Sequence, residues 1–464
     1  TIAALEDLPT TPITLAIRPE FIEGLDRSTL EDGDLLVRLQ STQSLNILSN
    51  TYVDVNQALT DQSESIFTDQ LRLGEDTLRR LLPTYKATRD IWFQQTPLFE
   101  GGAQILRNLG IRNIVMLREG SQGAKGADTD RPPTGLVELQ LPDGGVIDAA
   151  FVDIKLSAAL TRGSQNPRGG AYLVAQQILA ELKMLRSELN AEDFSTSDHG
   201  VLLSTDSGVL PSTAMLTALR TTLNANSAIT FVSLGELLST MTHEVKDGSR
   251  LTLDLAQDAD VPSISHQLFT QTQERVDAYT SMLAPGDAQA TQWKDLLSVM
   301  PARTLSNTQR QSYVDAIWLQ TFLLGEAIST PTSTTFTLGG RESSLRISLR
   351  NDNDYDVRVR VRLTSSKLAF SAAEQVVLLP AGMTTSIEVP VVAKSNGSFP
   401  VSLQLFSPSG NVAVGRSTTL TARVNALAGL GQLVTGLALL LLIIWWVYHL
   451  RRASRRKLNL TSGA

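Results

Sequence analysis

The sequence predicts an α/β domain, barrel-like with parallel strands and a helical extension, followed by an all-β immunoglobulin-like sandwich and one transmembrane helix. Three observations predict this fold class. Strand and helix patterns alternate before residue 240, the apolar period changes to two after residue 333, and no charged residue interrupts 425–450. The expected parts are the α/β domain at 1–240, a helical region packed on it at 241–330, the sandwich at 333–425, the membrane helix at 426–450 and a basic tail at 451–464.

The first 240 residues alternate short apolar runs with helical patterns such as 170–190 and 212–224. Strands separated by helices imply parallel crossovers, and hence an α/β domain, either open or closed into a barrel. A hairpin is expected around the turn Pro142-Asp143-Gly144-Gly145, between runs at 136–141 and 146–152. The expected strands outside the hairpin are Ile13–Ile17, Leu45–Leu48, Asp90–Trp92, Asn113–Leu117, Val201–Ser204 and Ile229–Val232.

The next part is predicted to be helical, in three segments at 264–282, 287–300 and 306–328. Proline separates them, because proline lacks the backbone donor that a helix interior requires. Ser306 followed by Gln309 has the spacing of a capping box at the start of the third helix. We expect these helices to support the α/β domain by packing on it.

Apolar residues alternate with polar ones after residue 333. Val357, Val359 and Val361 alternate with arginines, and polar turn sequences separate about seven such segments. Short alternating strands at this density are typical of an immunoglobulin-like sandwich, here without the cysteine pair.

A long apolar run near the end predicts the transmembrane helix, because about 20 apolar residues cross a bilayer core. A belt of Trp445, Trp446 and Tyr448 precedes a basic cluster, which the positive-inside rule places in the cytoplasm. We therefore expect a single-pass protein of the bacterial plasma membrane with its N-terminal part outside, exported by a signal that this numbering lacks. The basic residues are Arg451, Arg452, Arg455, Arg456 and Lys457.

Composition and motifs exclude several classes of function. The net charge is −7, and because the tail carries five basic and no acidic residues, residues 1–450 carry −12, which disfavours nucleic-acid binding. There is no cysteine, so disulfides, cysteine–zinc sites and thiol catalysis are excluded. No two of the four histidines are four residues apart, and no nucleophile elbow or phosphate-binding glycine motif occurs. We expect no metal site and no cofactor.

Polar residues after the expected parallel strands form the candidate site. Ligands meet the carboxyl ends of such strands, so these residues are expected on one rim, as ligand-binding candidates or, for two acids, as catalytic candidates. Two carboxylates about 5–9 Å apart cleave glycosidic bonds in many enzymes, so Asp54 and Asp206 are the pair considered, although each also fits a solvated acid or a helix cap. The ligand-binding candidates are Arg18, Glu20, Tyr52, Asp54, Asn56 and Trp92.

Several segments together resemble an actinobacterial envelope family known as domain of unknown function 6049. They include ITLAIRPEF at 13–21, ILSNTYVDVNQAL at 47–59, VLLSTDSGVLPSTAMLTALRTTL from 201 and LRISLRNDNDYDVRVRVRL from 345. The resemblance implies a head similar to polysaccharide deacetylase and glycoside hydrolase barrels, an immunoglobulin-like domain next to the membrane, and a gene often beside that of the lipid II flippase. It suggests a role in peptidoglycan assembly by association only.

The sequence departs from the family pattern where catalysis would be expected. Family members tend to have Asp-Pro-Asp after the second strand and Trp-Pro after a later one, whereas here Asn56 follows Val55 and Phe93 follows Trp92. The leading hypothesis is a non-catalytic protein that binds a cell-wall glycan or a partner such as the flippase. The alternatives are a metal-independent glycosidase or other carbohydrate-active enzyme, and a purely structural spacer.

Overall fold

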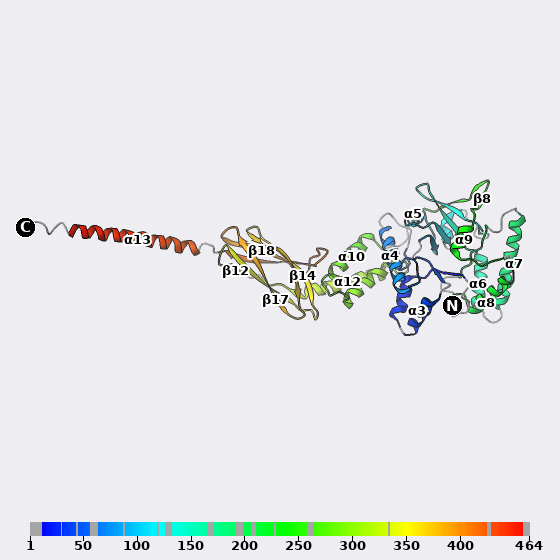
Figure 1. Ribbon diagram of the computed structural model, residues 1–464, viewed down its shortest axis with the longest axis horizontal. Helices are drawn as coiled ribbons and strands as arrows, with labels where there is room; N and C mark the ends of the chain where they lie inside the picture. The colour runs from blue at the N-terminus through cyan, green and yellow to red at the C-terminus, as the bar shows by residue number, and fades with distance from the viewer. Residues whose placement is uncertain are drawn as a thin grey trace, which may run out of the picture. The chain divides into compact units, whose positions relative to one another are not determined.

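A computed structural model describes two compact units, one of residues 1–267 with 298–310, the other of residues 268–297 with 311–464 (Figure 1). The expected domain boundaries at 240 and 330 stay predictions. The structure describes residues 12–28, 30–42, 45–55, 64–86, 89–117, 120–125, 132–165, 170–191, 198–205, 210–226, 229–257, 264–332, 335–424 and 428–457.

The centre of the first unit is a mixed six-stranded sheet in the order β3-β4-β7-β6-β10-β5. The pairs β3·β4, β4·β7 and β6·β10 are parallel, and β6·β7 and β5·β10 are antiparallel. Both faces of the sheet are covered by buried apolar clusters, one containing Trp92 and the other Ile91. The strands are β3 (Ile91–Gln94), β4 (Asn113–Met116), β5 (Ala124–Lys125), β6 (Val137–Gln140), β7 (Val146–Phe151) and β10 (Thr252–Leu255).

The parallel barrel predicted for residues 1–240 is wrong. The expected hairpin forms as β6 and β7 and reverses the strand direction within the sheet, so the parallel run is interrupted. The described residues 201–204 contribute only an isolated bridge from Leu202 to Val152, and 229–232 form no strand. Strands at 13–15, 45–47, 91–94 and 113–116 confirm four of the expected positions.

A separate two-stranded parallel sheet of β1 (Ile13–Leu15) and β2 (Leu45–Ile47) lies with three helices near the start of the chain. A buried cluster containing Ile22, Leu36 and Leu78 joins these elements, because each helix presents an apolar face to it. The helices are α2 (Pro19–Arg27), α3 (Leu30–Ser41) and α4 (Glu64–Leu81).

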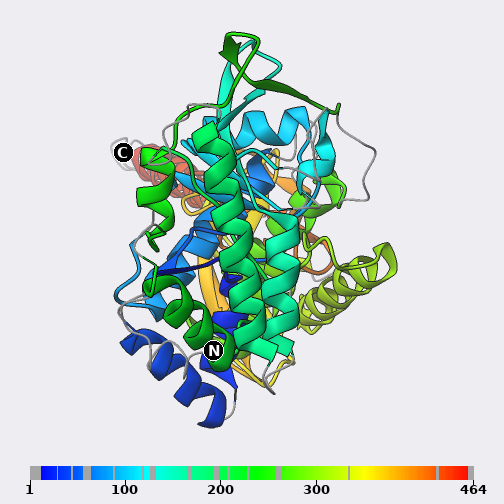
Figure 2. The same cartoon turned by 90° about the vertical axis from the view of Figure 1, so that its right-hand side faces the viewer.

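Further helices of the first unit pack among themselves or cover the six-stranded sheet. Helices α6, α7 and α8 share a core containing Leu160, Ile178 and Met215, and Figure 2 shows the long α7 lying beside its neighbours. Leu238 of α9 lies in the cluster on one face of the sheet. The remaining elements are α5 (Glu100–Asn108), the 3₁₀ turn Gly120–Gly123, α6 (Ile154–Gln165), α7 (Gly170–Ala191), α8 (Thr213–Asn224), α9 (Leu234–Thr240), β8 (Val245–Lys246) and β9 (Ser249–Arg250).

The three helices expected after residue 264 are present, as α10 (His266–Thr280), α11 (Ala288–Val299) and α12 (Asn307–Glu326). The predicted capping box is confirmed: the Ser306 backbone N–H donates to Gln309 Oε1 over 2.9 Å, and the Gln309 N–H donates to Ser306 Oγ over 3.3 Å. The compact units divide this helical segment, since residues 298–310 group with the first unit and its other residues from 268 on with the second.

The second unit contains a four-stranded sheet, β11-β13-β17-β15, and a five-stranded sheet, β12-β19-β18-β14-β16. The expected alternation is observed, since Val357, Val359 and Val361 of β14 are buried while its arginines are not. The strands are β11 (Ile328–Ser329), β12 (Thr335–Leu338), β13 (Glu342–Asn351), β14 (Val357–Thr364), β15 (Leu368–Phe370), β16 (Glu374–Leu379), β17 (Thr384–Ala393), β18 (Gly397–Phe406) and β19 (Thr418–Val424).

The prediction of a transmembrane helix at 426–450 is wrong. Within the part of the chain that the structure describes, no helix has the length and apolarity needed to cross a membrane. Helix α13 (Ala428–Lys457) is present at this position. The predicted single-pass topology and plasma-membrane location are overturned with it.

Candidate functional site

The candidate site is organised around Arg18, which lies between β1 and α2. Pro19 occupies the first turn of α2 and holds the preceding residue extended, with φ −72° and ψ 127° at Arg18. The guanidinium donates hydrogen bonds to Asn50 Oδ1 over 2.7 Å and to Thr51 Oγ1 over 3.0 Å. Arg18 therefore ties the start of α2 to the loop that follows β2.

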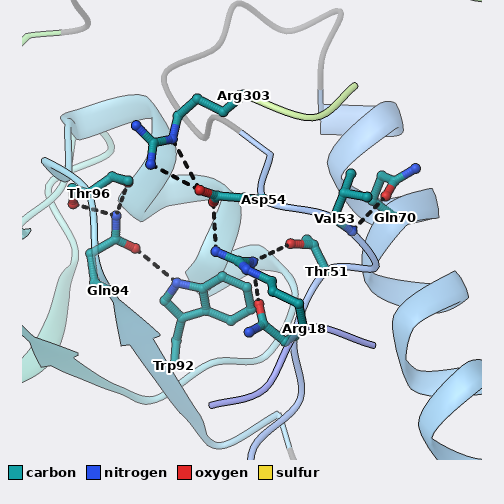
Figure 3. Close-up of polar contacts among 10 residues, drawn as sticks. Arg18, Thr51, Val53, Asp54, Gln70, Trp92, Gln94, Thr96 and Arg303 are labelled. Atoms are coloured by element: carbon teal, nitrogen blue, oxygen red, sulfur yellow. Dashed lines mark hydrogen bonds and ion pairs between the residues drawn. The ribbon is translucent and has the colours of Figure 1, made fainter. Parts of the chain in front are cut away.

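Asp54 lies between two guanidinium groups (Figure 3). Its Oδ1 accepts from Arg18 Nη2 over 2.6 Å, and its Oδ2 accepts from Arg303 Nη2 over 3.0 Å and from Arg303 Nε over 3.2 Å. The backbone N–H of Arg303 also donates to the Asp54 carbonyl. Both carboxylate oxygens thus accept charge-assisted hydrogen bonds, which fix the position of this side chain.

Helix α4 holds the loop that carries Asp54. The Tyr52 N–H donates to the Gln70 carbonyl, and Gln70 Nε2 in turn donates to the Ser298 carbonyl over 2.9 Å. The close approach depends on Gly74, because a Cβ there would lie 2.2 Å from the Asn50 carbonyl oxygen. The loop conformation is therefore set by long-range contacts rather than by its own sequence.

An open pocket of about 540 Å³, called the α2 pocket below, lies beside this network, with Arg18 as a shared residue. Phe21 is the exposed aromatic at the pocket, with a relative solvent exposure of 61%. An apolar ring with a few polar groups around it is a typical composition for a ligand site. The lining residues are Arg18, Glu20, Phe21, Gly24, Leu25, Ser28 and Asp32.

The pKa values of the ionisable groups at the site are shifted in different directions. Burial lowers the pKa of Arg18, an effect that the charge of Asp54 opposes. Burial raises the pKa of Glu20, and the neighbouring Arg18 opposes that shift. Burial also raises the pKa of Tyr52, and so does the hydrogen bond that its hydroxyl donates to Glu23 over 2.7 Å. The pocket therefore combines a fixed positive group with a carboxylate that gains a proton more readily than usual.

The structure brings together some of the residues expected on one rim. Arg18 contacts Asp54 directly, and Glu20 lies at the same pocket as Arg18. Tyr52 and Trp92 instead have buried rings in the core of the first unit, where Trp92 packs against Phe67 and its Nε1 donates to Gln94 Oε1 (Figure 3). Neither ring is accessible for stacking on a ligand.

Several other candidates cannot be placed at the site. Asn56 and Asp206 lie outside the described residues, so the proposed pair with Asp54 is untested. Trp445, Trp446 and Tyr448 are exposed on α13. The side chains of the basic cluster from Arg451 onward lie outside the described part.

Two important residues were missed by sequence reasoning. Arg303 lies about 250 residues from its partner Asp54, and no local pattern connects them. Phe21 had a detectable signal, because its helix buries Ile22 on the other side and an amphipathic pattern places position 21 outward. The pocket could therefore have been partly predicted from the helical face of α2.

Comparison with known protein families identifies the family of this chain. A family model matches residues 174–455, which is more than half of the sequence. This chain belongs to the family of unknown function (DUF6049). The resemblance inferred from the sequence motifs is confirmed at the level of the family. The match begins within α7, so Arg18 and Asp54 precede the matched range. A search of curated proteins gave no significant match.

Similar solved structures include three from different organisms. The PapD-like domain 7 of human CEP192 is 12% identical, covering 22% of this chain and 86% of that chain at a TM-score of 0.16. Native E. coli alpha-2-macroglobulin is 20% identical, covering 21% and 7% at 0.18, and the C. elegans MSP family member WR4 is 10% identical, covering 22% and 99% at 0.17. At these scores we infer neither fold nor function from the likenesses.

Proposed function

We propose that this protein is a non-catalytic binding protein whose α2 pocket takes a cell-wall glycan, in support of peptidoglycan assembly. The observation that carries the proposal is the exposed Phe21 beside Glu20 and the anchored Arg18. The ring offers an apolar surface for one face of a sugar, and the carboxylate and guanidinium offer an acceptor and donors for hydroxyl groups.

Asp54 has a positioning role in this proposal. Its two carboxylate oxygens accept hydrogen bonds from the guanidinium groups of Arg18 and Arg303. An anchor for Arg18 is the role that these contacts support. The expected actinobacterial source, and a working partnership with proteins of peptidoglycan synthesis such as the lipid II flippase, belong to the same proposal.

A sedimentation assay with purified, insoluble peptidoglycan tests the proposal. Wild-type protein is expected to sediment with the glycan, and Phe21→Ala is expected to weaken the apparent affinity at least tenfold, because about 1.4 kcal/mol of binding free energy corresponds to that factor. Tyr172→Ala is a matched control, since Tyr172 is an aromatic residue on α7 that is 56% exposed. Equal binding by wild type and Phe21→Ala, or no binding at all, would overturn the proposal.

A glycosidase is the second candidate, and the raised pKa of Glu20 favours it because a general acid must retain a proton. The same incubation distinguishes the two functions through the release of reducing sugar ends. Release that Glu20→Gln abolishes while sedimentation persists would establish the enzyme. Binding without release would support the non-catalytic function.

A further inference from the structure

A second cluster of polar side chains lies on the six-stranded sheet, away from the α2 pocket. It consists of Glu138 on β6, Asp148 on β7 and His243 in the segment before β8. One ligand atom from each residue lies within 4.8 Å of the other two. We propose that these three side chains bind a divalent transition-metal ion, with Zn²⁺ as the ion to test.

The hairpin fixes the two carboxylates opposite one another. The turn at 142–145 closes with the Leu141 N–H donating to the Gly145 carbonyl, and Gly144 adopts a φ of +81° that favours glycine. In the resulting register Glu138 pairs directly with Asp148, so both side chains project from the same face. Like charges directly opposite one another destabilise an antiparallel strand pair, and a bound cation would offset the repulsion between these two carboxylates.

Backbone contacts hold the histidine next to this pair. His243 bridges Leu136, whose N–H donates to the Thr242 carbonyl over 2.8 Å and whose carbonyl accepts from Glu244 over 2.8 Å. His243 Nε2 consequently lies 2.9 Å from Asp148 Oδ1 and 4.0 Å from Glu138 Oε1. The three side chains are only partly exposed, so their positions are restricted.

The distances suit a small divalent ion. Zn²⁺ bonds of about 2.0–2.2 Å in a tetrahedral arrangement place donor atoms roughly 3.3–3.5 Å apart. The two separations from Nε2, 2.9 Å to Asp148 and 4.0 Å to Glu138, lie on either side of that range, and each differs from it by about half an ångström or less. Imidazole together with carboxylates is a set that Zn²⁺ accepts, and three protein ligands leave one position for water or a ligand oxygen.

Arg250 is the competing cation at this cluster. Its Nη1 donates to Glu138 Oε1 over 2.8 Å, and the Arg250 side chain, at the end of β9, is 61% exposed. A metal ion bound by Glu138 must share the carboxylate with this guanidinium or displace it. Removal of the guanidinium should therefore strengthen metal binding at this cluster.

Isothermal titration of the untagged full chain with Zn²⁺ tests the site. We expect one equivalent to bind, with the affinity lowered at least tenfold in Asp148→Asn and in His243→Gln, and raised in Arg250→Ala. His199→Gln serves as the matched control, because His199 contacts Thr134 instead of this cluster, and its affinity should equal that of wild type. The chain has no cysteine to compete for the ion.

Two results would overturn the assignment. One is the absence of Zn²⁺ binding by the wild type, and the other is unchanged binding in both Asp148→Asn and His243→Gln. Circular dichroism establishes whether these two variants fold. If they do not, Arg250→Ala decides, because an affinity equal to that of wild type would place the ion elsewhere.

Discussion

Two groups of arginine and acidic side chains in this molecule share their chemistry and differ in how they are assembled. Arg18, Asp54 and Arg303 come from three segments far apart in sequence, whereas Arg362 and Glu374 are direct partners on the adjacent strands β14 and β16. The first group depends on long-range packing, and the second follows from strand register. The difference indicates that the geometry of Arg18, Asp54 and Arg303 is specific to this fold. The pair of Arg362 and Glu374 is of the kind found on the outer face of many sheets.

The largest effect on stability is expected for a substitution that disturbs the packing around the first group. Gly74→Ala places a Cβ against the backbone of the loop that carries Asp54, 2.2 Å from the Asn50 carbonyl oxygen. Backbone cannot yield as a flexible side chain can, so we expect the free energy of unfolding to fall by about 3 kcal/mol. Urea denaturation followed by tryptophan fluorescence measures it.

Gly33→Ala is the matched control for that substitution. Gly33 is also helical, and a Cβ there would meet nothing within 4 Å. Alanine is favoured over glycine within helices, so this variant should gain about 0.5–1 kcal/mol. Equal effects of the two alanines would show that the loop does not depend on close contact with α4.

An intermediate effect is expected for Arg18→Ala. This change leaves Asp54 with one guanidinium and deprives Asn50 and Thr51 of their donor. The side chains of Arg18 and Asp54 are 25% and 22% exposed, so the loss should lie between that of surface and buried pairs, at about 2 kcal/mol. Urea denaturation of the variant and wild type gives this difference. Arg18→Lys should recover only part of the loss, because lysine lacks the planar fork, and full recovery would contradict the geometry.

A smaller effect is expected for Arg362→Ala in the second group. The variant loses the pair with Glu374, a hydrogen bond to Asn411 Oδ1 and the contact of the guanidinium with the Phe406 ring, whose centroid lies 4.3 Å away. The partner Glu374 is 41% exposed, so solvent screens the pair and each contribution is modest, and about 0.5–1 kcal/mol is expected in urea denaturation. A loss as large as that of Arg18→Ala would erase the distinction between the two groups.

The same distinction explains what the sequence could predict. Period-two alternation predicts β14, because each side chain's face follows from its position within the strand. The capping box at Ser306 is equally local, and so is the hairpin that follows Leu136. These features need no knowledge of distant segments.

Correct prediction of the sheet topology, the rim and the partners of Asp54 would have required knowledge of which distant segments come together. In the six-stranded sheet β10 lies beside β6, although more than 100 residues separate the two strands in sequence. No local pattern indicates this pairing. Trp92 was expected at a ligand rim because it is the last residue of the expected strand Asp90–Trp92, yet it is buried beside Phe67. The contact of Asp54 with Arg303 could not be predicted either, because the sequence around Arg303 indicates only a linker between two helices.

The smallest expected effect concerns the pH dependence of the pocket. Burial raises the pKa of Glu20 above its ordinary value near 4.5, so the folded state binds that proton more tightly than the unfolded state. The resulting stabilisation is complete below the unfolded pKa and is lost as the pH rises through the folded pKa. Glu20→Gln cannot titrate, so its stability relative to wild type should increase between about pH 4 and pH 7, by less than the effect of Arg362→Ala. Thermal unfolding of both proteins across that range measures the trend, and parallel curves would show that the pocket leaves this carboxyl unperturbed.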